Sequence, residues 1–205
     1  MDDNGEDKGP EGLGISRPPP LLLRALRPED EPAARAAQAE LSTDNFGFLP
    51  DLREGEPWTG YVQRLELLRT GTEVPNGWVP TTFLVAEVAG ELVGRTSIRH
   101  GLNPWLAQWG GHIGYAVRPG FRRRGYATEI LHQSLAIASA LGIDNVLITC
   151  DVGNVASAAV IERCGGLLAD IVPGERGSAA KRRYWVEGTQ STHRARQDHS
   201  VEPTG

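Results

Sequence analysis

The 205-residue chain is poor in cysteine: it has only Cys150 and Cys164, which lie in apolar segments and make no disulfide framework. No apolar run approaches the roughly 20 residues needed to cross a bilayer, and no basic segment followed by an apolar one marks a secretory signal. The net charge of −5 gives the whole molecule no general attraction for nucleic acid or a membrane surface. These absences predict a cytoplasmic protein with neither nucleic acid nor a membrane as its partner.

Composition divides the chain into three parts. Residues 1–20 are rich in Asp, Glu, Gly and Pro and are predicted to form a disordered N-terminal extension. Residues 188–205 are polar and lack periodicity, which predicts a flexible C-terminal tail. The folded domain is therefore expected over residues 21–187, long enough for a well-buried core.

Periodicity and turn residues predict an α/β (α+β) domain. Helices are expected over 30–40, 59–70, 128–141 and 154–164, with Thr59 as the cap of the second. Strands are expected over 21–27, 82–88, 91–99, 111–117, 145–150, 167–172 and 181–186. Ala89-Gly90 would join the second and third of these strands in a hairpin.

The most informative segment joins the predicted strand 111–117 to the predicted helix 128–141. It holds three consecutive arginines, Arg122, Arg123 and Arg124, followed by Gly125. The N–H groups that open a helix have no intrahelical partners and attract anions. Glycine allows close approach of the backbone, and arginine can grip phosphate oxygens in pairs. The segment is predicted to bind a phosphate group, with a solvated loop as the alternative.

Two blocks of the sequence resemble the GNAT superfamily of N-acetyltransferases. The run 122–127, Arg-Arg-Arg-Gly-Tyr-Ala, is similar to its acetyl-CoA motif, which is Gln or Arg, two residues, Gly, one residue, then Gly or Ala. The second block is an apolar strand over 146–149, then Asn154, Ser157 and a helix that ends at Gly165. It is similar to the Asn-x-x-Ser pattern that follows the family's fifth strand.

A third segment narrows the resemblance. Residues 99–115, which include Arg-His-x-Leu-Asn and Gly-Gly-His-Ile-Gly-Tyr, are similar to a little-characterised bacterial-type subgroup of predicted acetyltransferases without an assigned acceptor. The two main blocks cover roughly 111–168. The resemblance implies a mixed, mostly antiparallel central sheet that is flanked by helices and splayed at the acetyl-CoA site.

The resemblance also implies which residues hold acetyl-CoA, the acetyl donor. Backbone amides would cradle its pyrophosphate, from Arg123, Arg124, Gly125, Tyr126, Ala127 and Thr128. The side chains of Arg122 and Arg124 are candidates for phosphate contacts, including the 3′-phosphate. Ala116 and Val117 would offer backbone groups to the pantetheine arm, and Asn154 and Ser157 would lie beside it. Asn154 is also a favoured helix N-cap, a role compatible with the first.

Acetyl transfer needs a neutral amine, whereas a lysine-like ammonium has a pKa of about 10.4, so a base must remove its proton. Three side chains are candidates, in this order: His112, His100 and Asp151. For each of them a structural hydrogen bond is the alternative interpretation. The tyrosine that many family members use as the acid is replaced by Ile161. Tyr115, Tyr126 or water must then serve, or the thiolate leaves unassisted.

The sequence thus predicts an enzyme that transfers acetyl directly to a primary amine in a ternary complex. The alternative is a non-catalytic acyl-CoA sensor. Asn103, Trp105 and Trp109 are expected to line the acceptor pocket, and the negative net charge favours a cationic amine, such as a polyamine, an aminoglycoside or a basic peptide. A peptide N-terminus stays open as acceptor. The histidines show no metal-ligand spacing, so no metal is predicted, and a homodimer is neither favoured nor excluded.

Overall fold

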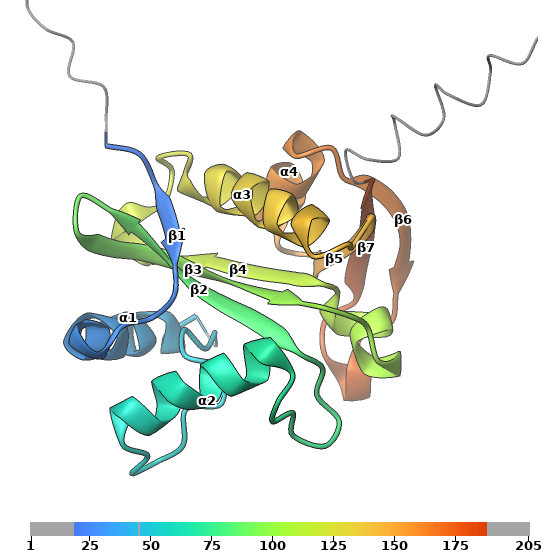
Figure 1. Ribbon diagram of the computed structural model, residues 1–205. Coiled ribbons are helices and arrows are strands. Elements are labelled where there is room, and N and C mark those ends of the chain that lie inside the picture. The colour runs from blue at the N-terminus through green and yellow to red at the C-terminus, as the bar shows by residue number, and fades with distance from the viewer. Residues whose placement is uncertain (1–18, 45, 188–205) are drawn as a thin grey trace, which may run out of the picture.

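The computed structural model describes residues 19–44 and 46–187 (Figure 1). Most of the predicted extension, residues 1–18, and the whole predicted tail, residues 188–205, lie outside the described residues. Within the described ranges, no helix has the length and apolar character needed to span a membrane.

Strands and helices follow one another in a mixed order. The strands are β1 (Leu22–Arg24), β2 (Thr81–Val88), β3 (Glu91–Arg99), β4 (Ile113–Val117), β5 (Asn145–Asp151), β6 (Leu167–Val172) and β7 (Lys181–Glu187). The α-helices are α1 (Glu31–Ser42), α2 (Trp58–Thr70), α3 (Tyr126–Ala140) and α4 (Val155–Arg163). Every predicted element is present, with ends that differ by up to three residues. A π-helical turn, η2 (Leu106–Gly110), was not predicted.

The start of α2 corrects one prediction. Pro57 is the N-cap and Thr59 lies within the first turn, so Thr59 does not cap the helix. The indole of Trp58 is buried, and its Nε1–H donates to the carbonyl of Arg27 at 3.2 Å. Packing of this side chain therefore makes Trp58 the first residue of the helix, one residue before Thr59. The predicted end is confirmed, because Gly71 adopts the left-handed conformation (φ 74°) at the C-cap.

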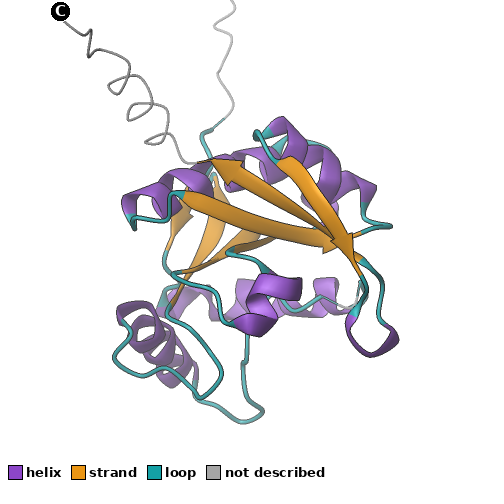
Figure 2. Ribbon diagram, turned by 90° about the vertical axis from the view of Figure 1, so that its right-hand side faces the viewer, coloured by secondary structure: helices purple, strands orange, loops and turns teal. Residues whose placement is uncertain are grey.

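The strands form two antiparallel sheets. The first has the order β1-β2-β3-β4, and the second has the order β5-β7-β6. The hairpin between β2 and β3 turns at Ala89 and Gly90, both with positive φ (52° and 84°), as a two-residue type I′ turn requires. Figure 2 shows helices on both sides of the strands. The predicted mostly antiparallel sheet with flanking helices is confirmed.

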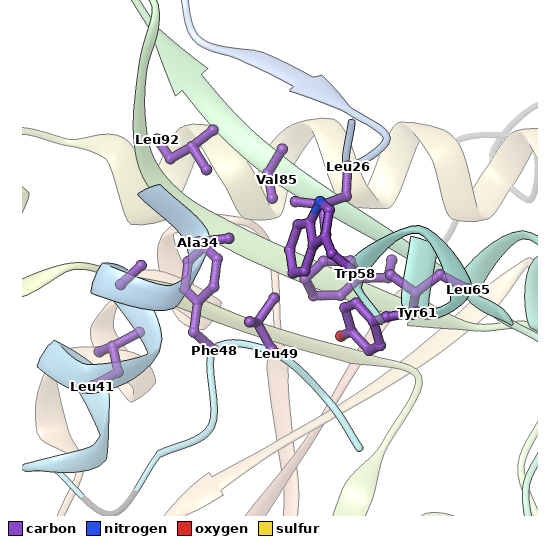
Figure 3. Close-up of a cluster of buried hydrophobic side chains, with 12 residues drawn as sticks. Leu26, Ala34, Leu41, Phe48, Leu49, Trp58, Tyr61, Leu65, Val85 and Leu92 are labelled. Carbon is purple, nitrogen blue, oxygen red and sulfur yellow. The ribbon is translucent and has the colours of Figure 1, made fainter. Parts of the chain in front are cut away.

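Apolar side chains fill both faces of the first sheet. On one face α1 and α2 close a core around Phe48, Trp58 and Tyr61 (Figure 3). On the other face α3 and α4 cover a second core, which includes Ile148 and Ile161. Burying each such side chain contributes about 1.5–3 kcal/mol, so these two layers hold the strands in place.

The two sheets meet at one point. The His112 N–H donates to the Leu147 carbonyl at 2.7 Å, and the Leu147 N–H donates to His112 Nδ1 at 2.9 Å. Among the described residues, no other backbone hydrogen bond joins β4 to β5. Figure 1 shows the second sheet turned away from the first. The strands therefore diverge beyond this junction, which confirms the predicted splay.

Candidate active site

The loop before α3 presents a row of free amides. The N–H groups of residues 123–128 have no acceptor within the described chain, since the first helical bond runs from the Glu129 N–H to the Gly125 carbonyl at 3.2 Å. Arg123 (φ 65°) and Gly125 (φ 83°) are left-handed on either side of Arg124, a backbone pattern that turns successive N–H groups into a concave anion site. A Cβ added at Gly125 would meet no atom within 4 Å, so the space beside its backbone is open. This geometry supports the predicted phosphate site.

The three arginine side chains differ in their contacts. Arg122 forms an ion pair with Asp44, and the Arg124 guanidinium lies 5.6 Å from the ring centre of Phe121. Arg123 forms no hydrogen bond or ion pair with the described residues. It is therefore the arginine with all of its donors available to a phosphate, although Arg122 and Arg124 were the predicted candidates.

The free edge of β4 faces the gap between the sheets. Its register with β3 is fixed by two backbone bonds, Arg118 N–H to Val93 O (2.9 Å) and Arg99 N–H to His112 O (2.8 Å). Because bonding alternates along an antiparallel pair, the backbone groups of Ala116 point into β3, and those of Tyr115 and Val117 point into the gap. The prediction for Ala116 needs this correction: Tyr115 takes its place beside Val117 at the open edge.

Tyr115 also bridges β4 and the start of α4. Its Oη lies 3.0 Å from Ser157 Oγ, and burial raises the pKa of Tyr115 to about 12. Asn154 caps α4 as predicted, because its Oδ1 accepts the Ser157 N–H at 3.0 Å. Ile161 is fully buried in the core and offers no acid. The Tyr115 hydroxyl is therefore the phenol that the structure places at this side of the gap. Its role in catalysis and the contacts of Asn154 and Ser157 with a cofactor stay predictions.

His112 lies at the junction of the sheets rather than in an open site. It is 7% exposed, and its Nδ1 accepts the Leu147 N–H. A neutral imidazole with Nδ1 as acceptor carries its proton on Nε2 and has no free lone pair for an amine. Burial, with a further contribution from Arg99, lowers the pKa of His112. The geometry thus favours the structural interpretation over the predicted role of general base.

Acidification should destabilise the protein through His112. Its pKa in the folded protein lies below the usual 6.5, so just below that pH the unfolded chain binds a proton that the folded protein does not. Stability then falls as the pH drops, by at most about 1.4 kcal/mol per pH unit for this group. The test variant is His112→Asn, whose amide oxygen can accept the Leu147 N–H. In urea unfolding, its free energy of unfolding should fall less between about pH 7.5 and about pH 5.5 than that of wild type.

The matched control for this experiment is His132→Asn, since His132 is exposed on α3. It should keep the wild-type pH dependence. Part of the pH dependence of the unfolding free energy should remain in every variant, because burial also lowers the pKa of His100. An unchanged slope in His112→Asn would show that this imidazole does not titrate differently in the two states.

The other two candidate bases are held in separate places. His100 Nε2 lies 2.8 Å from Thr82 Oγ1, at the start of β2. Asp151, at the end of β5, pairs with Lys181 at 2.5 Å and keeps its side chain 47% exposed. The structure therefore does not gather His100, Asp151 and His112 into one cluster. No three His, Cys, Asp or Glu side chains of the described ranges gather around a metal position either.

Two of the three predicted acceptor-pocket residues line a common pocket. Trp105 Nε1–H donates to Glu175 at 2.7 Å, and Trp109 Nε1–H donates to the Pro173 carbonyl at 3.0 Å. The pocket, of about 140 Å³, is lined by Trp105, Trp109, Glu175, Ser178 and Lys181. Asn103 is not among these residues: its Oδ1 accepts the Leu106 N–H and its Nδ2 donates to the Gly77 carbonyl. Its role is to hold the turn that carries the tryptophans.

Sequence reasoning missed two side chains of β3 that face the same side of the sheet as Gly114. Arg95 is 8% exposed, and Arg99 is half-buried beside it. The signal was present, because strand alternation puts both arginines on one face of a strand whose interior is otherwise uncharged. A charged residue inside a predicted core strand is a site candidate in its own right.

The chain belongs to the GNAT acetyltransferase family: the family model described as "Acetyltransferase (GNAT) domain" matches residues 20–166. No curated protein matches the sequence. Similar solved structures include RimL, the ribosomal L7/L12 alpha-N-protein acetyltransferase, in complex with coenzyme A. It has 20% sequence identity and a TM-score of 0.61, and the match covers 82% of this chain and 93% of that one.

Two more solved structures have the same fold. MccE, the microcin C7 self-immunity acetyltransferase, in complex with acetyl-CoA and AMP, has 16% identity and a TM-score of 0.58, over 82% of this chain and 92% of that one. An N-acetyltransferase from Staphylococcus aureus Mu50 has 16% identity and a TM-score of 0.57, over 82% and 98%. At these identities the likeness establishes the fold alone.

Proposed function

We propose that this protein is an acetyl-CoA-dependent N-acetyltransferase that passes the acetyl group directly to a primary amine in a ternary complex. The observation that carries the proposal is the row of free amides at residues 123–128, directly after the strand with an open edge. Membership of the GNAT family supports it, and so do the structures of RimL with coenzyme A and of MccE with acetyl-CoA.

The gap between the sheets suits an extended thioester. With the pyrophosphate on the amides before α3, the pantetheine arm would run along β4 and bond the backbone groups of Tyr115 and the N–H of Val117. The Val117 carbonyl already accepts Arg122 Nε–H at 3.1 Å. The closed end of the gap, at His112 and Leu147, would limit how deep the arm enters. A free amide of β4 beside the thioester carbonyl would stabilise the oxyanion that forms during transfer.

Proton handling is assigned to Tyr115 and Asp151. A phenol with a pKa of about 12 stays protonated and is a much weaker acid than a thiol, whose pKa is about 8.5, so Tyr115 would donate a hydrogen bond to the departing sulfur rather than surrender its proton. Asp151 has a half-exposed carboxylate beside the tryptophan pocket, through its pair with Lys181. It is the base candidate that the geometry favours, acting directly or through water.

The proposal is tested by incubating the purified protein with acetyl-CoA and a panel of primary amines and measuring the free thiol. Thiol release that depends on the amine, with an acetylated product found by mass spectrometry, is the expected result. The alternative function is a non-catalytic acyl-CoA sensor, which the apolar Ile161 favours because it removes the usual acid. Tight CoA binding with no release for any amine would establish the sensor.

The arginine loop should distinguish CoA from dephospho-CoA. Arg123→Gly removes the one side chain of the three without a partner among the described residues and keeps the left-handed backbone. A charge-assisted hydrogen bond to phosphate is worth roughly 1.5–3 kcal/mol, so CoA affinity should fall at least about tenfold. The affinity for dephospho-CoA should fall less. Replacing all three arginines by alanine should lower the CoA affinity more than Arg123→Gly does. Calorimetric titration checks this; unchanged affinities for both ligands would make the run a solvated surface.

A further inference from the structure

Arg95 and Arg99 lie side by side over β4, on the face opposite α3. Ser97, between them on β3, pairs with Gly114 of β4. A Cβ placed on Gly114 would lie 3.8 Å from Arg99 Nη1, 3.8 Å from Arg99 Nη2 and 3.9 Å from Arg95 Nη1. Two guanidinium groups thus converge on the one β4 position without a side chain, at the centre of the strand that borders the gap.

Neither arginine has an acidic partner among the described residues. Arg95 donates to the Gly47 carbonyl, to the Gly114 carbonyl and to Ser97 Oγ, and it lies against the ring of Phe46. Its Nε is buried and has no acceptor. Arg99 uses only Nη1, which donates to the carbonyls of Gly110 and Gly111. Its Nε and Nη2 have no partner in residues 19–44 and 46–187.

Most other low-exposure arginines of the described chain have acidic partners, although Arg182 resembles Arg95 in having a buried Nε without an acceptor. Arg24 pairs with Asp30 and Glu87, Arg64 with Asp51 and Glu56, and Arg118 with Glu40. Burial lowers the pKa of Arg95 to about 9, with a contribution from the neighbouring charge of Arg99. An unpaired buried charge is costly to a fold, and two adjacent ones of the same sign cost more. Such a pair fits a site whose negative partner arrives as a ligand.

We propose that Arg95 and Arg99 bind an oxyanion of the acceptor, so that the amine acetylated by this protein belongs to a small molecule that also carries a carboxylate or a phosphate. This rests on the proposed acetyltransfer, since the arginine pair flanks the strand along which the thioester would lie. The proposal replaces the expectation of a cationic acceptor. The acceptor contacts the local positive charge of the two guanidinium groups, whereas the net negative charge is spread over the whole surface.

The test uses the purified full chain and two matched acceptor series, free α-amino acids and the same amino acids as carboxamides, with aminomethylphosphonic acid as the phosphate-like probe. Wild type should prefer the anionic series at least tenfold in kcat/KM. Arg99→Met should remove that preference by raising KM for the anionic amines, with KM for acetyl-CoA unchanged. Arg64→Met, which removes a carboxylate-paired arginine, should keep the preference. A stronger response to the phosphonate would identify phosphate as the natural group.

A second readout separates this proposal from the proposed function. The same amines are titrated calorimetrically into the CoA complex, where binding needs no turnover. In one outcome, the carboxylates or the phosphonate bind wild type, do not bind Arg99→Met, and are not acetylated. That outcome would support the anion site and overturn the proposed acetyltransferase activity. Equal binding and equal turnover of carboxylates and carboxamides in wild type would overturn the anion site. The wild-type comparison decides this even if Arg99→Met does not fold.

Discussion

Gly125→Glu should weaken CoA binding at least about 100-fold, or roughly 2.7 kcal/mol, in a protein that still folds. The free amides of residues 123–128 surround this position, and a Cβ added there would meet no atom within 4 Å. The glutamate would occupy the space reserved for the pyrophosphate and add charge repulsion, which between partly screened charges about 4 Å apart is about 1–4 kcal/mol. Calorimetry with CoA measures the loss.

Gly142→Glu is the matched control for this variant. Gly142 follows the opposite end of α3, has nearly the same backbone (φ 80° against 83°) and also has no atom within 4 Å of its Cβ position. Both variants should lose about 1–3 kcal/mol of stability from the left-handed strain. Only Gly125→Glu should lose affinity for CoA. A folded Gly125→Glu protein with wild-type CoA affinity would reject the phosphate site.

Gly111→Ala should destabilise the protein by about 2–6 kcal/mol, the sum of backbone strain and overpacking. Gly111 has φ 66° and ψ −177°, a region open almost only to glycine. An added Cβ would lie 2.6 Å from the Leu147 carbonyl, the acceptor of the His112 N–H. The substitution thus pushes β5 away from β4 at the one place where they meet. Chemical denaturation measures the effect.

Gly101→Ala is the control for Gly111→Ala. Gly101 lies in the turn after β3, its φ is not in the left-handed range, and a Cβ there would meet no atom within 4 Å. The free energy of unfolding of the Gly101→Ala protein should stay within about 0.5 kcal/mol of the wild-type value. If Gly111→Ala were equally stable, the contact between the sheets would be loose enough to absorb a methyl group, contrary to the geometry described above.

Features set by neighbouring residues were predictable from the sequence. Gly71 ends α2 because glycine tolerates a positive φ, and Asn154 caps α4 because its side chain reaches the Ser157 N–H three residues on. The loop at 122–127 was predictable for the same reason, since its glycine and the following helix start act locally. Periodicity together with turn residues was enough to place the strands.

Features set by distant residues were not predictable. The sequence offered His112 as a base because a histidine there suits either chemistry or structure; the partner that decides between them, Leu147, lies 35 residues away. Ala116 and Tyr115 could be told apart only once the bonds between β3 and β4 fixed the register. Arg95 contacts Gly47, which is 48 residues away, so its lack of an acidic partner became visible only in the fold.

The order of the strands has a consequence for how the chain folds. Strands β1 to β4 pair in chain order, and the core between them and helices α1 and α2 is built from buried residues within 26–92. This sheet and its core can form before residues 145–187 leave the ribosome, because they need no later strand. The second sheet then docks through the contact between His112 and Leu147. On this order of folding, the gap beside β4 would be the seam between the part that folds first and the part that folds last.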